Sequence, residues 1–108
     1  MSKGVALITG AADRIGAAIA TALASDGYHT IIHYNSSGAK ADALAAHIIA
    51  SGGTAATIGA DLLDRDERDS LIERASELFG PIDILINNAS IFQPDSIADL
   101  SADLWQKH

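Results

Sequence analysis

The sequence predicts an α/β fold, a doubly wound parallel sheet with the strand order 3-2-1-4. Two observations lead to this class. Apolar runs typical of strands alternate with longer segments of helical periodicity along the chain, at the spacing expected for strand–helix–strand units. No repeat, low-complexity tract or charged linker interrupts that alternation. With 108 residues, 48% of them hydrophobic, residues 1–108 are expected to form part of one domain.

Four apolar segments are expected to form the strands of this sheet. They are Val5–Thr9, Thr30–Tyr34, Thr54–Gly59 and Ile82–Ile86. The last one contains a continuous apolar run, Ile84–Ile86, which suits a central strand that is buried on both faces. A sheet that ended there would leave an unpaired edge. We therefore expect another chain, or further residues of this protein, to cover the fourth strand.

Three helices are expected between the strands, each with an apolar face and a glycine at its end. The face of the first consists of Ile15, Ile19, Ala22 and Leu23. That of the second consists of Ala41, Leu44, Ala45 and Ile48. That of the third consists of Leu71, Ile72, Ala75, Leu78 and Phe79, opposite the charged residues Arg65 to Asp69, Glu73, Arg74 and Glu77. The helices end at Gly27, Ser51–Gly53 and Gly80–Pro81.

Composition excludes several classes of function. The formal net charge is −7, and the 7 basic residues form no cluster, which argues against a nucleic-acid partner. Cysteine is absent, so disulfides and thiolate chemistry are excluded. The four histidines lack metal-ligand spacing, and His47 is expected on a helix surface. The first apolar run is too short for a signal peptide or a membrane span, which favours a cytoplasmic protein without a membrane partner.

A glycine-containing turn, "TGAADRIG", follows the first strand directly. A turn from strand to helix attracts phosphate, because the first N–H groups of the helix lack partners and its dipole favours negative charge. Gly10 and Gly16 supply positions where the backbone needs a positive φ or must approach a ligand closely. No "GK[ST]" follows, so this is not a P-loop. The turn is predicted to bind a dinucleotide through Gly10, Ile15 and Gly16.

The end of the second strand indicates which dinucleotide binds. Sites for the unphosphorylated ribose place an Asp or Glu there, whereas this chain reads "HYNSS". A carboxylate about 4 Å from a 2′-phosphate would repel each unit charge by about 4 kcal/mol at an effective dielectric near 20. The predicted cofactor is therefore NADP(H), with Arg14 and the hydroxyls of Ser36 and Ser37 beside its 2′-phosphate. The alternative is a plain polar turn and a solvated arginine.

Two further loops follow the third and fourth strands, at the same edge of the sheet. Asp61 could accept a hydrogen bond from an adenine amino group, and Leu62 adjoins it. Asn88, Ala89 and Ser90 could let the backbone approach the ribose. The alternative is that Asp61 or Asp64 caps a helix and that the asparagines form a tight turn.

Three motifs together resemble the N-terminal half of the short-chain dehydrogenase/reductase family: "TGAADRIG", "DLLD" and "DILINNAS". The resemblance implies a Rossmann-type sheet and an oxidoreductase that transfers hydride between a nicotinamide and a carbonyl or pterin-like substrate. Most members carry Gly where Arg14 and Ser90 stand. Arg14, "HYNSS" and "NNASIF" resemble the pteridine reductase-like branch. This resemblance implies that NADPH is held by Arg14 and by His33, Tyr34, Asn35, Ser36 and Ser37, and that Phe92 stacks on a pterin. That branch often has Arg at the position of Ser36, so one phosphate contact is expected to be missing.

The catalytic residues of that family, a Tyr and a Lys four residues apart, are absent here. Tyr28 and Tyr34 are followed at that distance by Ile32 and Gly38. We expect the catalytic half to lie beyond His108, after a helix that Ser101 caps and that begins near Ala102. The 108 residues alone should then bind cofactor without turnover, and the resemblance implies a homo-oligomer for the full-length protein.

Two other interpretations remain open. One is a non-catalytic NADP(H)-sensing module that never had the tyrosine–lysine pair. The other is a different nucleotide-binding α/β domain, such as a methyltransferase. Such domains generally place an acid at the end of the second strand, so Asn35–Ser37 weighs against this last class.

Overall fold

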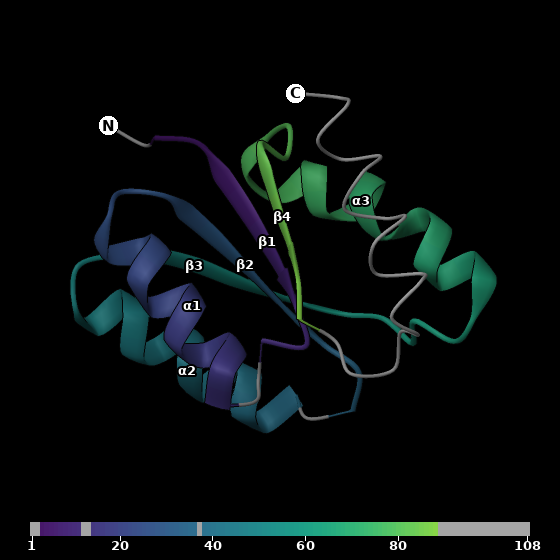
Figure 1. Ribbon diagram of the computed structural model, residues 1–108, viewed down its shortest axis with the longest axis horizontal. Coiled ribbons are helices and arrows are strands. Elements are labelled where there is room, and N and C mark those ends of the chain that lie inside the picture. Colours follow the sequence, from purple (N-terminus) through teal and green to yellow (C-terminus); the bar gives the residue numbers. More distant parts are fainter. Residues whose placement is uncertain (1–2, 12–13, 37, 89–108) are drawn as a thin grey trace.

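The computed structural model describes residues 3–11, 14–36 and 38–88. Its four strands are β1 (Val5–Thr9), β2 (His29–Tyr34), β3 (Thr54–Gly59) and β4 (Ile84–Asn87). Its three helices are α1 (Arg14–Ser25), α2 (Gly38–Ala50) and α3 (Arg65–Phe79). Within the described residues every predicted strand and helix is therefore present (Figure 1). The helix expected near Ala102 lies outside them.

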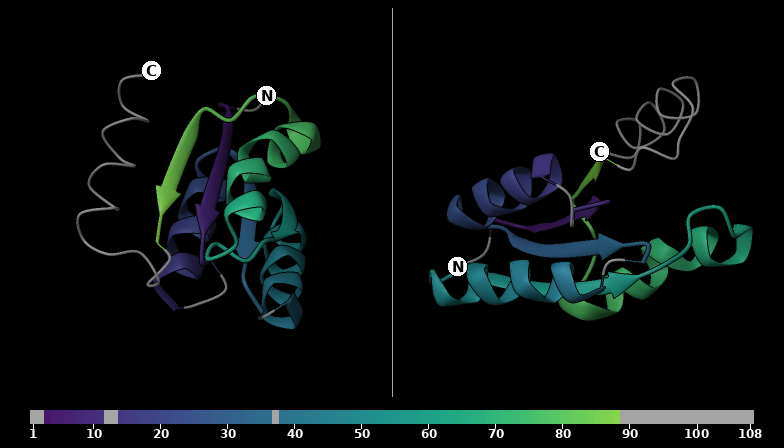
Figure 2. Two further views of the ribbon diagram at one scale, coloured as in Figure 1. Left: turned by 90° about the vertical axis from the view of Figure 1, so that its right-hand side faces the viewer. Right: turned by 90° about the horizontal axis from the view of Figure 1, so that it is seen from below.

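The strands form one parallel sheet in the order β3-β2-β1-β4, which confirms the predicted order. Leu7, at the middle of β1, is in register with Ile31 of β2 and Leu85 of β4. Figure 2 shows β1 and β4 side by side and running in the same direction. Because all four strands are parallel, their carboxyl ends lie along a single edge of the sheet.

Core clusters cover both faces of the sheet, as expected for a parallel sheet. Side chains alternate along β1: Val5 and Leu7 join the cluster that includes α3, whereas Ala6 and Ile8 join the cluster that includes α1 and α2. Figure 1 shows the same arrangement, with α1 and α2 on one face of the sheet and α3 on the other. β1 is fully enclosed and therefore forms the centre of the core.

The buried face of α1 differs in part from the predicted one. Ile19 and Leu23 pack against the core, as predicted. Ile15 is 67% exposed and Ala22 is also exposed, whereas α1 buries Gly16 and Ala20. Small residues on this face let the helix approach the strands closely, and they contribute little to an apolar pattern. On α2, the predicted Ala41, Leu44, Ala45 and Ile48 are all buried or partly buried.

The predicted face of α3 is partly wrong in the same way. Leu71 and Ala75 are buried, and Phe79 packs against their cluster. Ile72 and Leu78 are 40% and 43% exposed, so they flank the buried face instead of belonging to it.

Strand β4 begins two residues later than predicted, at Ile84. The preceding residue, Asp83, forms hydrogen bonds with Val5 of β1 through both its side chain and its backbone. Its carboxylate accepts a hydrogen bond from Val5 N at 2.8 Å, and Asp83 N donates to Val5 O at 2.9 Å. Ile82 packs against the core cluster on the α3 side without forming part of the strand.

Candidate functional site

The candidate site lies where the four strands end, at the carboxyl edge of the sheet. The strands end at Thr9, Tyr34, Gly59 and Asn87. Hydrogen bonds connect the residues around these ends: Ala11 N donates to His33 O, Ala60 N donates to Tyr34 O, and Asn88 N donates to Thr9 Oγ1. Open α/β sheets bind their ligands at this edge.

The turn after β1 is shaped by two glycines. Gly10 has a φ of 62°, in the left-handed region that glycine adopts at no steric cost. Gly16, in the first turn of α1, has no room for a side chain. A Cβ there would lie 2.5 Å from Ala11 Cα and 2.8 Å from both Gly10 O and Asn88 Nδ2. The start of α1 is thereby pressed against the turn.

A second set of hydrogen bonds joins this turn to the end of β4. Thr9 Oγ1 donates to Asn87 Oδ1 at 3.0 Å and accepts from Asn88 N at 3.0 Å. Asn88 Nδ2 donates to Gly10 O at 3.3 Å. Sequence reasoning placed Asn88 in the site but did not single out Thr9 or Asn87 as parts of it. A threonine directly before the first glycine was the available signal.

His33 does not line the open part of the site, although it was predicted there as a cofactor-binding residue. It is 1% exposed and lies beneath the turns. Nδ1 accepts a hydrogen bond from Gly10 N at 3.0 Å, and Nε2 is 2.8 Å from Ala60 O. Its backbone oxygen accepts from Ala11 N at 3.0 Å. His33 therefore connects the turns after β1 and β3 from below.

The remaining described residues of "HYNSS" are more open. The Tyr34 ring lies over Gly59 and Gly38, where added Cβ atoms would meet it at 2.9 and 3.4 Å. Asn35 and Ser36 are exposed at the start of the connection to α2. In the described part of this connection, residues 35, 36 and 38, no side chain carries a negative charge. The surface beside the end of β2 is therefore neutral and polar.

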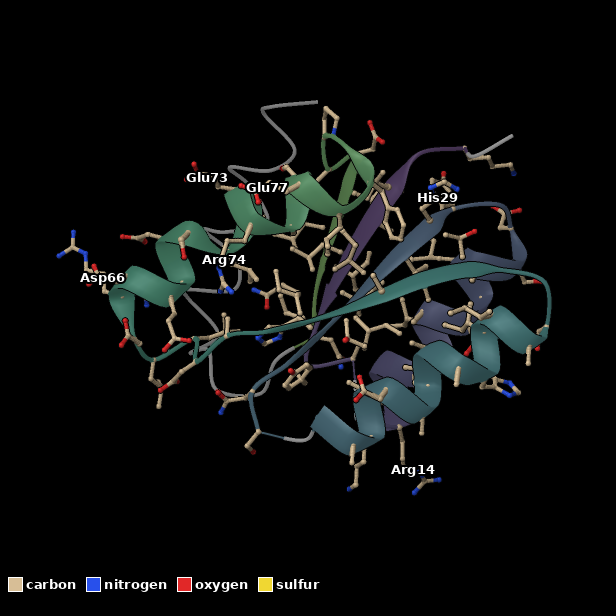
Figure 3. The ribbon with its side chains drawn as sticks, turned by 180° about the vertical axis from the view of Figure 1, so that it is seen from behind. Arg14, His29, Asp66, Glu73, Arg74 and Glu77 are labelled. Atoms are coloured by element: carbon tan, nitrogen blue, oxygen red, sulfur yellow. The ribbon has the colours of Figure 1, made fainter. Side chains whose placement is uncertain are left out.

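Arg14 and Ile15 lie in the first turn of α1, and both are exposed. Figure 3 shows the Arg14 side chain extending away from the body of the molecule. Together with Ala18 and Ile19 they line an open, mainly apolar hollow of about 750 Å³ beside the N-terminal half of α1. The structure thus leaves Ile15 accessible, whereas the sequence analysis had placed it on the buried face of the helix.

The turn after β3 shows the capping arrangement that was the alternative to ligand binding. Asp61 Oδ1 accepts from Leu63 N at 3.0 Å, and Asp61 N donates to Glu67 Oε1 at 3.2 Å. Asp64 is the N-cap of α3. Leu62 is 2% exposed and belongs to the core, so its side chain supports the turn from inside. Asp61 itself is exposed.

Arg74 was predicted on the charged outer face of α3, and this prediction is wrong. Figure 3 shows its side chain extending from α3 toward the end of β3, whereas Glu73 and Glu77 lie on the outer side. Nη1 donates to Gly59 O at 3.3 Å, and Nη2 is buried without a hydrogen-bond partner among the described residues. The available signal was its place between Leu71 and Ala75, at the border of the apolar face.

Four predicted site residues lie outside the described residues: Ser37, Ala89, Ser90 and Phe92. Among the residues that the structure does describe, no three His, Cys, Asp or Glu side chains come together as a metal site would require. Within the same ranges, every helix is too short or too polar to cross a membrane.

Comparison with known proteins extends this picture over the whole chain. The family model of the short chain dehydrogenases matches residues 4–108. A 3-oxoacyl-(acyl-carrier-protein) reductase of Synechocystis is 41% identical over 102 residues, which are 94% of this chain and 41% of that protein. An L-rhamnose 1-dehydrogenase (NAD(P)(+)) of Azotobacter vinelandii is 39% identical, with 94% of this chain and 41% of that protein covered.

Solved structures show the same relationship. The FolM alternative dihydrofolate reductase 1 of Brucella canis, complexed with NADP, superimposes with a TM-score of 0.80 at 35% identity, covering 97% of this chain and 49% of that one. The chain therefore spans between two fifths and a half of the length of these three proteins. Its sheet order, its glycine turn and these matches agree: the chain belongs to the short-chain dehydrogenase family.

Proposed function

We propose that the protein carrying this chain is an NADP(H)-dependent oxidoreductase, and that the described residues form its cofactor site. The observation that carries the proposal is the neutral end of β2, beside a turn whose glycines leave room for a phosphate. Asn35 and Ser36 are exposed there, and no described residue of the connection carries a carboxylate. Solved relatives from Brucella canis and Burkholderia cenocepacia contain NADP, which supports the same choice.

The described residues fit a dinucleotide. The close packing at Gly16 brings the N-terminus of α1 to the turn, where the positive end of the helix dipole would favour a pyrophosphate. Asn35, Ser36 and Arg14 would surround the 2′-phosphate, and one oxygen of the exposed Asp61 carboxylate would remain for the adenine amino group. The bound cofactor would supply the hydride. Ser37, Ala89 and Ser90 complete the proposed cofactor site.

The substrate proposed here is a carbonyl compound or a pterin-like imine, and Phe92 is the proposed contact to the latter. The pterin alternative is supported by the likeness to a protein described as an alternative dihydrofolate reductase. The 3-oxoacyl reductase and the rhamnose dehydrogenase among the relatives support the carbonyl alternative. Because the sequence holds no Tyr-x-x-x-Lys, we expect these 108 residues alone to bind cofactor without turnover. Cytoplasmic location and homo-oligomerisation are further proposals.

The proposal is tested by titrating the protein with NADPH and NADH, following the fluorescence of the reduced nicotinamide. We expect tighter binding of NADPH. Ser36→Asp places a carboxylate at the neutral end of β2, and should weaken NADPH binding about tenfold, equivalent to about 1.4 kcal/mol, while sparing NADH. Ser51→Asp adds the same charge in the turn before β3, away from the site, and should change neither affinity. Equal affinity for both coenzymes in the unmodified protein would refute the proposal.

A further inference from the structure

His33 is the one described side chain that connects two of the site turns through opposite ends of its ring. It is buried on the α3 side of the sheet, with 1% of its surface exposed. Nδ1 lies 3.0 Å from Gly10 N, and Nε2 lies 2.8 Å from Ala60 O. The ring therefore spans the distance between the glycine turn after β1 and the turn after β3. One imidazole thus contacts Gly10, which lies 23 positions before it in the sequence, and Ala60, which lies 27 positions after it.

The two partners fix the protonation state of the ring. A backbone N–H can only donate, so Nδ1 must offer its lone pair to Gly10. A backbone carbonyl can only accept, so Nε2 must carry the proton that Ala60 O receives. Only the neutral Nε2–H tautomer satisfies both bonds. A second proton on Nδ1 would face the N–H of Gly10 and break that bond.

The surroundings favour this neutral form. Burial lowers the pKa of His33 below its ordinary value of 6.5, the bond to Ala60 O raises it, and the charge of Arg74 lowers it. Arg74 is the charged group that α3 presents to the ring. Gly10 and Ala60 bring no charge from the turns after β1 and β3, and the neighbouring Asp61 is exposed and engaged with Leu63 N. The charge on His33 is therefore added only at acidic pH.

We propose that His33 is a positioning residue, which holds the glycine turn in its phosphate-binding shape only in the neutral Nε2–H form. The proposal rests on the function proposed above and adds a regulation to it: cofactor affinity falls as the ring takes up a second proton. Protonation breaks the bond to Gly10 N and releases the turn against which α1 begins. This loss of affinity is the opposite of what the charge alone would cause, because a cationic ring beneath a phosphate would strengthen cofactor binding.

Two substitutions separate the two ring nitrogens. In His33→Asn, the side-chain oxygen takes the place of Nδ1, so it can accept from Gly10 N but cannot titrate. In His33→Gln, the amide nitrogen takes the place of Nε2, so it can donate to Ala60 O while Gly10 N loses its acceptor. The asparagine variant should therefore bind NADP at neutral pH within about threefold of the unmodified protein, and the glutamine variant at least about tenfold more weakly.

The decisive measurement is the dissociation constant of NADP from about pH 8 down to the lowest pH at which the protein stays folded, made by calorimetry on the protein as its gene encodes it. The 2′-phosphate of the cofactor itself titrates near pH 6 and so changes the affinity of any variant. The unmodified protein is therefore compared with His33→Asn, in which the contribution of the phosphate is the same. We expect the dissociation constant of the unmodified protein, divided by that of His33→Asn, to stay level at alkaline pH and to rise at least about threefold at the acidic end. A level ratio throughout, or tighter binding by the unmodified protein in acid, would overturn the proposal.

Substitutions of Arg74 should shift the pH at which affinity is lost, and no such shift is expected if His33 has only a structural role. Removing its positive charge in Arg74→Gln should raise the pKa of His33 and shift the loss of affinity to higher pH. Arg74→Lys keeps the charge and should leave the profile near its original position. An identical profile in both variants would contradict the proposed titration.

The ring can also be observed without cofactor. Nitrogen-15 NMR of the labelled protein should show His33 as the Nε2–H tautomer at neutral pH, and an Nδ1–H tautomer would overturn the inference. This separates two failures. If NADP does not bind at neutral pH while the expected tautomer is present, the proposed function fails. If NADP binds with the same pH profile in the unmodified protein and in His33→Asn, the positioning role fails.

Discussion

At the scale of single residues, the shape of the candidate site depends on the absence of a side chain at Gly16. Gly16 lies so close to the turn after β1 that an added Cβ would touch backbone on two sides, at Ala11 and Gly10. Such contacts cannot relax by rotating a side chain, because backbone atoms of the turn would have to move. The residue therefore fixes the distance between α1 and the end of β1.

Gly16→Ala is expected to lower the free energy of unfolding by about 1–3 kcal/mol, the usual cost of overpacking, and to weaken NADPH binding because the turn must shift. Urea unfolding and a fluorescence titration measure the two effects. Gly38→Ala is the matched control: its Cβ would meet the Tyr34 ring at 3.4 Å, an ordinary contact, and alanine suits the helix better. Equal losses in both variants would contradict the role given to Gly16.

At the scale of elements, the start of α3 shows how a turn of the site is held in place. Asp64 Oδ1 accepts from Glu67 N at 3.1 Å, which satisfies one of the free donors of the first helical turn. The Glu67 carboxylate reaches back to Asp61 N. The capping bonds therefore determine the shape of the turn after β3, to which His33 also connects.

Asp64→Ala should destabilise the protein by about 1 kcal/mol, because Glu67 N loses its acceptor. Asp64→Asn keeps an acceptor at the same place and should stay close to the original stability. Chemical denaturation of the three proteins checks this expectation. A similar loss in the asparagine variant would assign the effect to charge instead of capping.

Most elements could be predicted from the sequence, because periodicity and glycine stops mark strands and helices independently of distant contacts. The errors have particular causes. On α1, glycine and alanine form the buried face, and they weigh less in an apolar pattern than the exposed Ile15. The start of β4 was misplaced because the Asp83 carboxylate takes over a backbone role.

The site was less predictable than the fold. Its location followed from the strand ends, which a parallel sheet brings to one edge. The roles of Thr9, His33 and Arg74 depend on which atoms meet across the folded chain. Thr9 and Asn88 are 79 residues apart, and His33 and Ala60 are 27 apart. No local pattern contains that information.

At the scale of the whole molecule, Asp83 connects the beginning of β1 to the last described strand. Its carboxylate accepts from Val5 N across 78 residues, in a part-buried position. Gly4 makes room for it, because a Cβ there would lie 2.7 Å from the carboxylate oxygen. The sheet is thus held at its amino edge by Asp83 and at its carboxyl edge by the bonds between Thr9, Asn87 and Asn88.

Asp83→Ala is expected to cost about 1–3 kcal/mol, because Val5 N is left unpaired in a residue that is 5% exposed. Asp26→Ala removes a carboxylate from an exposed ion pair with Lys3 and should stay within about 0.5 kcal/mol of the original. Thermal unfolding of both variants makes the comparison. If the two cost the same, the long-range bond contributes no more than a surface pair.

The place of β1 in the sheet also has a consequence for biosynthesis. Of the described strands, β1 leaves the ribosome first, yet its second neighbour, β4, is made about eighty residues later. Until then β3, β2 and β1 can pair, but the backbone groups of β1 that will bond to β4 have no strand to pair with. Nascent chains halted before Ile84 should therefore expose the edge of β1 to chaperones that recognise strands, and chains in which Asn87 has emerged should expose the edge of β4 instead.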